Sequence, residues 1–142
     1  MAKIYFVYHD RFFLEFIESF LKRKGFEIFA SVDGAGVVSD ITRLCPDIVI
    51  FSKNIKNIDI EGFLIRKKLM AQLKFTKIFL IGNYTQEEKK LYKKYEINDF
   101  IQTPLKLSLL MEHLGQYLTI NNNENSKSTP MLSDLYAKKN VL

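Results

Sequence analysis

Five short apolar segments recur along the chain, and each is followed by a longer segment with helical periodicity. The apolar segments are rich in Ile, Val, Phe and Tyr, which favour strands; they cover Lys3–Tyr8, Glu27–Ser31, Asp47–Phe51, Lys77–Ile81 and Asp99–Gln102. The first, third and fourth are apolar nearly throughout, which is typical of strands covered by helices on both faces. This alternation predicts a single α/β sandwich with a doubly wound parallel sheet.

The segments between the predicted strands carry helix signals of their own. Their approximate ranges are Arg11–Lys24, Ala35–Leu44, Ile60–Leu73, a fourth helix that opens at Thr85 and a fifth that starts after Pro104. Thr85 and Glu88 form a capping-box pattern, and Pro104 suits the first turn of a helix. Helical spacing predicts that the first and third helices bury Phe13, Phe16, Ile17, Phe20 and Leu21, and Phe63, Leu64, Leu69 and Met70, respectively.

Length and composition suit one domain. The chain has 142 residues, of which 47% are hydrophobic, so a real core can form. No apolar run approaches the roughly 20 residues that span a bilayer, and the first residues do not resemble a signal peptide, so we expect no membrane partner. The one cysteine, Cys45, cannot form an internal disulfide, which fits a reducing cytosol and a cytoplasmic protein.

The charge is basic but modest. The net charge is +5 and the isoelectric point is about 9.2, which favours acidic partners. Lysines are spread over many predicted helices, often beside Glu, as on an ordinary solvated surface. We therefore expect an acidic protein partner rather than a nucleic acid.

The amino-acid composition of the chain changes near its end. Residues 1–119 contain all the predicted strands and helices, whereas the segment from about Ile120 is rich in Asn and Ser and predicts a flexible linker. Leu132, Leu135 and Tyr136 then recur with helical spacing. Residues 120–142 are therefore expected to be a linker followed by either a short docking helix or a frayed terminus.

Polar residues gather where the predicted strands end. Binding sites of open parallel sheets lie beyond the carboxyl ends of the strands. The residues expected there are His9 and Asp10, Ser52 to Asn54, Gly82 and Asn83, and Thr103 and Pro104. A candidate site should therefore be built from these four strand ends.

Residues 3–119 resemble a known family in the order and spacing of these units. Asp33-Gly34, Pro46-Asp47 and Thr103-Pro104 stand where landmarks of the receiver domain of two-component response regulators stand. The resemblance implies the CheY-like, flavodoxin-like fold, with five parallel strands in the order 2-1-3-4-5. It also implies a signalling role and an acidic pocket at the strand ends.

The acidic pocket departs from the pattern of that family. In receivers, two acidic residues after the first strand bind Mg²⁺, and an aspartate after the third strand accepts a phosphoryl group. The corresponding residues here are His9, Asp10 and Ser52, of which only Asp10 matches. Mg²⁺ prefers several oxygen ligands, usually carboxylates, and a neutral serine is a poor nucleophile. We expect weak or absent Mg²⁺ binding, no phosphotransfer and no other cofactor.

The positions that respond to phosphorylation in receivers also depart in part from the family pattern. The resemblance places the phosphate-contacting hydroxyl at Gly82 and the phosphate-contacting lysine at Thr103, both of which are mismatches. The aromatic switch position is Phe100, which matches in shape. Without the hydroxyl that would couple phosphate to this aromatic residue, we expect one constitutive state.

Other roles for the strand-end residues remain open. Ser52 and His9 could form a nucleophile and base, but no oxyanion hole or clear third orienting group is evident, so we expect no enzyme. Asp10 would otherwise cap the first helix. Lys53 would point either toward Asp10 or to water.

One surface could bind a partner. The face that receivers use for their partners would carry basic and aromatic residues: Lys89, Lys90, Tyr92, Lys93, Lys94, Tyr95 and Lys106. Such a patch is either a solvated lysine face or a docking site. We expect a phosphorylation-independent pseudo-receiver, a monomer or weak homodimer, that binds proteins in bacterial two-component-type signalling or localisation. The alternatives are an atypical receiver switched by a ligand and a nucleic-acid-binding module.

Overall fold

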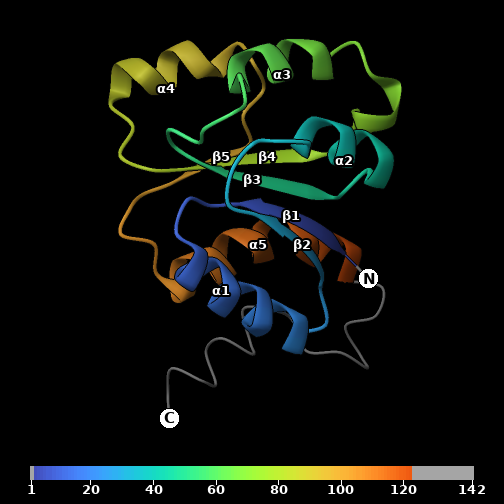
Figure 1. Ribbon diagram of the computed structural model, residues 1–142, viewed down its shortest axis with the longest axis vertical. Coiled ribbons are helices and arrows are strands. Elements are labelled where there is room, and N and C mark those ends of the chain that lie inside the picture. Colours follow the sequence, from blue (N-terminus) through green and yellow to red (C-terminus); the bar gives the residue numbers. More distant parts are fainter. Residues whose placement is uncertain (1, 123–142) are drawn as a thin grey trace. The chain divides into compact units, whose positions relative to one another are not determined.

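The computed structural model describes residues 2–122, and the chain divides into two units, Met1–Gln102 and Thr103–Leu142. The first unit contains one five-stranded sheet, drawn in Figure 1; its strands are β1 (Lys3–Val7), β2 (Glu27–Ser31), β3 (Ile48–Ser52), β4 (Lys77–Ile81) and β5 (Asp99–Ile101). All neighbours pair in parallel, in the order β2-β1-β3-β4-β5. The predicted α/β fold and strand order are confirmed.

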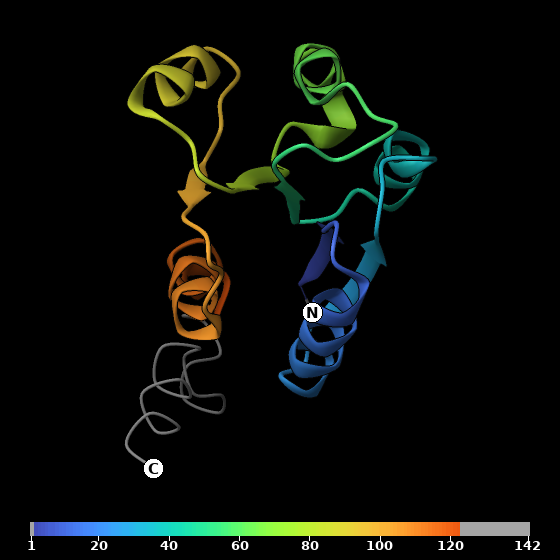
Figure 2. The same ribbon diagram turned by 60° about the vertical axis from the view of Figure 1, so that its left-hand side comes forward.

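Helices cover both faces of this sheet. The first unit contains α1 (Arg11–Arg23), α2 (Val37–Leu44), α3 (Ile60–Lys67), the 3₁₀ helix η1 (Ala71–Leu73) and α4 (Gln86–Lys93). In Figures 1 and 2, α1 lies on one face of the sheet, and α2, α3 and α4 lie on the other. The second unit, described separately, contains α5 (Leu107–Asn122).

The core explains why the central strands are so apolar. Every residue of β3 is buried, including Ser52 at its end. On the face covered by α2 and α3, Val49 and Phe51 pack in one cluster with Ile41 and Phe63. A central strand that is covered on both faces has no position that can stay polar, which is why β3 reads as a continuous apolar run.

Gly34 marks a close approach between two loops at the carboxyl edge of the sheet. Its backbone N–H donates to the Lys56 carbonyl at 2.7 Å. A Cβ at this position would lie only 2.3 Å from the Ile58 Cβ, so no larger residue fits without moving the loop. The Asp33-Gly34 landmark therefore has a steric function here.

The buried face of α1 differs from the prediction. Its buried residues are Leu14, Ile17 and Leu21, whereas Phe16 is 49% exposed. Leu14, Ile17 and Leu21 form one stripe of the helix, and Phe16 lies about a third of a turn or more away from it. The prediction of a buried Phe16 was wrong because it merged two adjacent stripes.

The third and fifth helices also have corrected bounds. α3 ends at Lys67 rather than near Leu73, because the backbone is extended at Met70 before η1 begins. Leu69 is consequently 86% exposed instead of buried, and Leu73 is fully buried in the core cluster. α5 begins at Leu107, since its first helical N–H bond ends on the Lys106 carbonyl.

Pro104 therefore precedes α5 rather than forming its first turn. At its other end, α5 continues to Asn122, past Ile120, where the predicted linker was expected to start. The remaining predicted linker and the residues with helical spacing near Leu132 lie outside the described residues.

Candidate functional site

The predicted strand-end residues of the first unit meet at one edge of the sheet. β1 and β3 are neighbours with Val7 opposite Phe51, and β3 and β4 are neighbours with Ser52 opposite Ile81. Residues that directly follow these strands are therefore brought together, as expected for a parallel sheet.

Ser52 and His9 touch at this edge. The Ser52 Oγ lies 3.3 Å from the His9 Nδ1, and the His9 ring stacks on Tyr8 with centroids 4.7 Å apart. Ser52 is only 2% exposed, so its hydroxyl has little access to a substrate. The contact satisfies a buried hydroxyl at the end of β3.

Asp10 caps α1. Its Oδ1 accepts a hydrogen bond from the Phe13 backbone N–H at 3.2 Å. This contact confirms the capping role and engages the one carboxylate at the acidic-pocket positions. Among the described residues, no hydrogen bond joins Asp10 to His9, so Asp10 does not serve as the orienting acid that a serine nucleophile needs.

The oxygen donors at this edge do not fit a Mg²⁺ site. Mg²⁺ demands near-octahedral oxygen ligation, usually with carboxylates. Asp10 is the one acidic residue among the acidic-pocket positions, and the other two positions hold a histidine and a serine. Within residues 2–122, no group of three or more His, Cys, Asp or Glu side chains is placed to hold a metal ion.

Lys53 points in neither predicted direction. Its Nζ lies 2.7 Å from the Asn83 carbonyl oxygen and 2.9 Å from the Glu88 Oε2. It also lies 4.8 Å from the centroid of the Tyr84 ring. Lys53 therefore ties the end of β3 to the N-terminus of α4. The prediction that Lys53 faces Asp10 or water was wrong, because its partners lie in the loop after β4 and on α4, which follow it in the chain.

Glu88 completes this contact. It accepts from the Thr85 N–H at 2.9 Å in a capping box, while the Thr85 hydroxyl accepts from the Glu88 N–H. The Thr85 N–H, and after it the Lys53 ammonium, hold the pKa of Glu88 below its ordinary value. One carboxylate thus serves the helix cap and the ion pair together, and the capping-box prediction is confirmed.

Gly82 is required by the position of Lys53. A Cβ on Gly82 would lie 2.7 Å from the Lys53 Cβ and 3.3 Å from a carbon of the Tyr84 ring. The first distance is shorter than real Cβ contacts allow, and the backbone φ of 156° also suits glycine. Gly82 and Lys53 are thus coupled, so a hydroxyl residue at position 82 would have to displace Lys53.

An aromatic cluster, formed by Tyr84, Tyr92, Tyr95 and Phe100, lies beside this contact. The ring centroids of Tyr84 and Phe100 are 5.3 Å apart, and those of Tyr84 and Tyr92 are 5.8 Å apart. Tyr92 also packs on Tyr95. Burial raises the pKa of the Tyr84 phenol well above its ordinary range. The sequence predicted Phe100 and Tyr92 but missed Tyr84, which follows a loop glycine without any periodic pattern.

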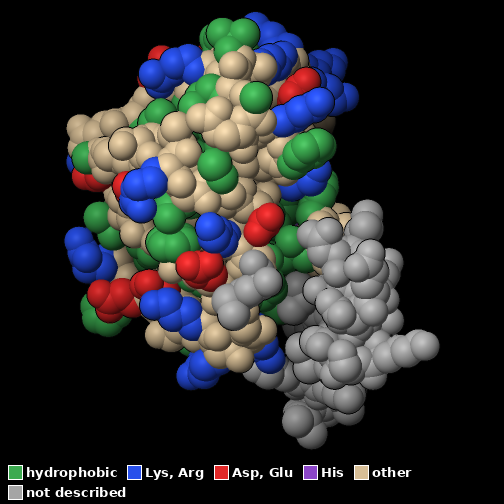
Figure 3. Space-filling model, turned by 90° about the vertical axis from the view of Figure 1, so that its right-hand side faces the viewer, with side chains coloured by type: hydrophobic (Ala, Val, Ile, Leu, Met, Phe, Trp, Pro, Cys, Tyr) green, Lys and Arg blue, Asp and Glu red, His purple; other side chains and the backbone are tan. Residues whose placement is uncertain are grey.

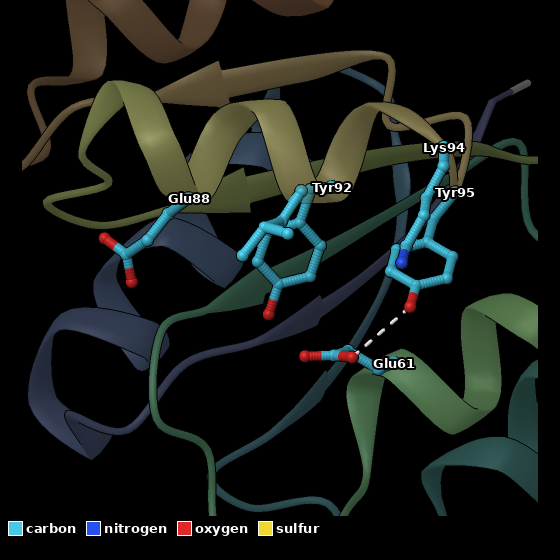
Figure 4. A pocket seen from close by; sticks show the side chains of 6 residues that line it. Glu61, Glu88, Tyr92, Lys94 and Tyr95 are labelled. Atoms are coloured by element: carbon cyan, nitrogen blue, oxygen red, sulfur yellow. Dashed lines mark hydrogen bonds between the residues drawn. The ribbon is translucent and has the colours of Figure 1, made fainter.

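Figure 4 shows a shallow groove between α3 and α4, into which Tyr92, Tyr95 and Glu61 point. The Tyr95 hydroxyl lies 3.3 Å from the Glu61 Oε2. The groove holds about 160 Å³, below the roughly 300 Å³ at which small-molecule sites begin. Its size suits one side chain rather than a cofactor. The lining residues are Glu61, Glu88, Leu91, Tyr92, Lys94 and Tyr95.

The lysines of the predicted partner face fall into both units. Lys90, Lys93 and Lys94 are exposed at α4, and Lys89 is half-buried with its Nζ 5.8 Å from the Phe100 ring centroid. Lys106 and Thr103 belong to the second unit. The structure thus brings most of the predicted basic surface onto α4.

Comparison with known proteins rests on structure, since no model of a protein family and no curated protein sequence matches this chain. The chemotaxis protein CheY4 of Vibrio cholerae gives a TM-score of 0.74 at 21% identity, covering 83% of this chain and 99% of that chain. The signal receiver domain of a Luxo repressor protein from Vibrio parahaemolyticus gives 0.74 at 14% identity, covering 90% of this chain and 98% of that chain.

A third match is a receiver domain whose structure contains a magnesium ion. The receiver domain of a sensor histidine kinase from Pseudomonas aeruginosa, with a magnesium ion coordinated in its active-site cleft, gives a TM-score of 0.71 at 18% identity. The match covers 83% of this chain and 98% of that chain. Together with the strand order, these matches show that the chain has the CheY-like fold of response-regulator receiver domains.

Proposed function

We propose that this protein is a pseudo-receiver, a protein-interaction module of two-component-type signalling or localisation that works without phosphorylation. The observation that carries the proposal is the Lys53 contact with Asn83 and Glu88. It joins the end of β3 to the start of α4 through a side chain of the protein itself. A phosphoryl group is not needed to make this connection.

The residues at the acceptor and hydroxyl positions of the strand ends support the same proposal. The acceptor position is the buried Ser52, and the hydroxyl position is Gly82, where the Lys53 stem leaves no room for a side chain. An acyl phosphate requires a carboxylate nucleophile and a metal ion that neutralises the phosphoryl oxygens. Neither requirement is met by the residues at this edge.

The proposed partner surface is α4 with its aromatic cluster. The exposed Lys90, Lys93 and Lys94 present positive charge, and Tyr92 and Tyr95 supply the aromatic contacts that interfaces favour. This chemistry fits an acidic protein surface. We expect the module to act in the cytoplasm as a monomer or weak homodimer.

The decisive experiment is a titration with Mg²⁺ and beryllofluoride, followed by amide NMR. We expect no saturable shift changes at Ser52, Gly82 or Phe100, because position 52 has no carboxylate to hold the fluoride complex. Mg²⁺-dependent, saturable changes at these amides would overturn the proposal.

A second experiment tests the surface. Proteins captured by the wild-type chain are compared with those captured by the double variant Lys90→Glu/Lys94→Glu and by the control Lys56→Glu, whose side chain is exposed outside α4. A genuine partner is retained by the control and lost by the double variant. Equal capture by both variants would exclude α4 as the partner surface.

A further inference from the structure

The segment from α3 into β4 is basic and contains no acidic residue. Residues 65–77 hold five cations, namely Arg66, Lys67, Lys68, Lys74 and Lys77. We call this segment the α3–β4 patch. Lys67 is buried and Lys77 is half-buried, but Arg66, Lys68 and Lys74 are exposed.

Three large apolar side chains of the same patch stand in solvent. Leu69 is 86% exposed, Phe75 is 78% exposed and Ile65 is 52% exposed. Most of each side chain projects outward instead of lying in a groove. Exposed apolar side chains that gather in one place usually mark an interaction surface.

Buried residues hold the backbone of the α3–β4 patch in place. Leu73 is fully buried, and the buried Thr76 hydroxyl donates to the Pro46 carbonyl at 2.7 Å. These two residues anchor the backbone on either side of Lys74 and Phe75. The exposed pair is therefore held at the surface by its neighbours.

The exposed cations have no acidic partner of their own. Among the described residues, the ion pairs of Lys22, Arg43 and Lys53 with carboxylates do not involve the α3–β4 patch. Glu96 acts electrostatically on the buried Lys67 of the patch. The Lys68 Nζ donates to the Lys94 carbonyl at 2.5 Å, and the Lys74 Nζ lies 5.7 Å from the Phe75 ring centroid. Their positive charge is thus available to an external anionic surface.

We propose that the α3–β4 patch docks the protein on an anionic phospholipid surface, with Leu69 and Phe75 entering the headgroup region and the cations facing the lipid phosphates. Apolar side chains flanked by lysines are the chemistry of interfacial membrane binding. In Figure 3, which faces the side where α3 leads into β4, basic and hydrophobic side chains lie next to one another near the top, with a few acidic side chains among them.

Other anionic partners fit the patch less well. Nucleic acids are bound by aromatic stacking and cations, and the exposed aliphatic side chains of Leu69 and Ile65 would gain nothing there. The expectation of no membrane partner rested on the lack of a bilayer-spanning run, and no helix of the described residues could cross a membrane. Interfacial docking requires no spanning helix.

The first test is flotation of the full chain with vesicles. Vesicles of phosphatidylcholine alone are compared with vesicles that contain about one third phosphatidylserine. We expect binding to the anionic vesicles only, weakened roughly 30-fold by Lys68→Gln/Lys74→Gln, since each cation near such a surface contributes about fivefold. The variant Leu69→Ser/Phe75→Ser should also bind more weakly, while the control Arg11→Gln/Arg23→Gln, which changes two exposed cations of α1, should bind as the wild type.

The second test uses the absence of tryptophan from this chain. Phe75→Trp introduces a single fluorophore in the α3–β4 patch, and Phe12→Trp introduces one at another highly exposed phenylalanine, on α1. Anionic vesicles should shift the emission of the Phe75→Trp protein to shorter wavelength and leave that of the Phe12→Trp protein unchanged.

The outcomes separate this proposal from its competitors. Equal binding to neutral vesicles, equal loss in the control Arg11→Gln/Arg23→Gln, or an unshifted Phe75→Trp emission would each overturn it. A shift produced by a DNA duplex but not by vesicles would assign the α3–β4 patch to nucleic acid instead. None of these results depends on the pseudo-receiver proposal, because no residue of α4 is changed in any of the variants.

Discussion

Gly82 and Lys53 directly follow the neighbouring strands β4 and β3 and constrain each other. The Lys53 Cβ occupies the space that any side chain at position 82 would need. The ammonium of the same lysine then reaches Asn83 and Glu88. A glycine at the hydroxyl position is therefore one half of a packed pair rather than an isolated loss.

The first prediction concerns this pair. Gly82→Ala should lower the free energy of unfolding by about 1–3 kcal/mol, because the new Cβ overpacks against Lys53. In the background of Lys53→Gly the same change should cost markedly less. Chemical denaturation of the wild type, both single variants and the double variant measures the coupling. Strictly additive effects would show that the two positions do not share this space.

Side chains on and after the strands connect the sheet to the helices that cover it. Lys53 joins β3 to α4, and the Tyr5 hydroxyl joins β1 to α2 by donating to the Asp40 Oδ2 at 2.7 Å. Tyr5 is 3% exposed, and burial raises the pKa of its phenol above the ordinary range. The hydrogen bond from Tyr5 lowers the pKa of Asp40.

Tyr5→Phe should therefore destabilise the protein by about 1 kcal/mol, since it removes one hydrogen bond and keeps the buried ring. Thermal unfolding followed by circular dichroism gives the change. Tyr8→Phe is the matched control, because its hydroxyl makes no hydrogen bond among residues 2–122. A larger loss for Tyr8→Phe than for Tyr5→Phe would contradict the role given to Asp40.

The N-terminus of α4 should respond to acid. The folded-state pKa of Glu88 is lowered, first by the Thr85 N–H and then by Lys53. Its contribution to stability is therefore complete above the ordinary pKa of 4.5 and is lost as the pH falls below that value. The stability of wild-type protein should decline more steeply between about pH 5 and pH 3 than that of Glu88→Gln. Parallel curves for the two proteins would assign the acid response to other carboxylates.

On the scale of the whole molecule, the fold is that of receiver domains, while the residues at its reactive edge depart from the pattern expected for that family. A CheY-like sheet brings the ends of β1, β3 and β4 together whatever residues stand there. The chemistry depends on several of these residues at once. Replacing one of them should not be sufficient to recover it.

Ser52→Asp should therefore fail to restore phosphorylation by acetyl phosphate and Mg²⁺. The new carboxylate would have only Asp10 as an acidic neighbour among the pocket positions, and Lys53 would still be engaged by Glu88. Intact-protein mass spectrometry detects the added phosphoryl group. Stoichiometric, Mg²⁺-dependent labelling would show that the rest of the edge is still competent.

Local patterns in the sequence identified the elements well. Strands β2 and β4 have their predicted bounds, and Thr85 opens α4 with the predicted capping box. Asp10 caps α1 as expected. These features depend on residues a few positions apart, so periodicity and capping chemistry are enough to find them.

The sequence by itself determined the α/β alternation, the strand order through the resemblance, and the residue types at the strand ends. Only the tertiary structure decided which partners the side chains find: Lys53 pairs with Glu88, and Tyr84 packs against Phe100. It also decided that Leu69 is exposed to solvent. The physical reason is the separation along the chain between the residues that interact. Helix and strand signals come from neighbours in sequence, whereas a side chain at the edge of the sheet finds its partner on another strand or helix, at a distance that only the folded chain defines.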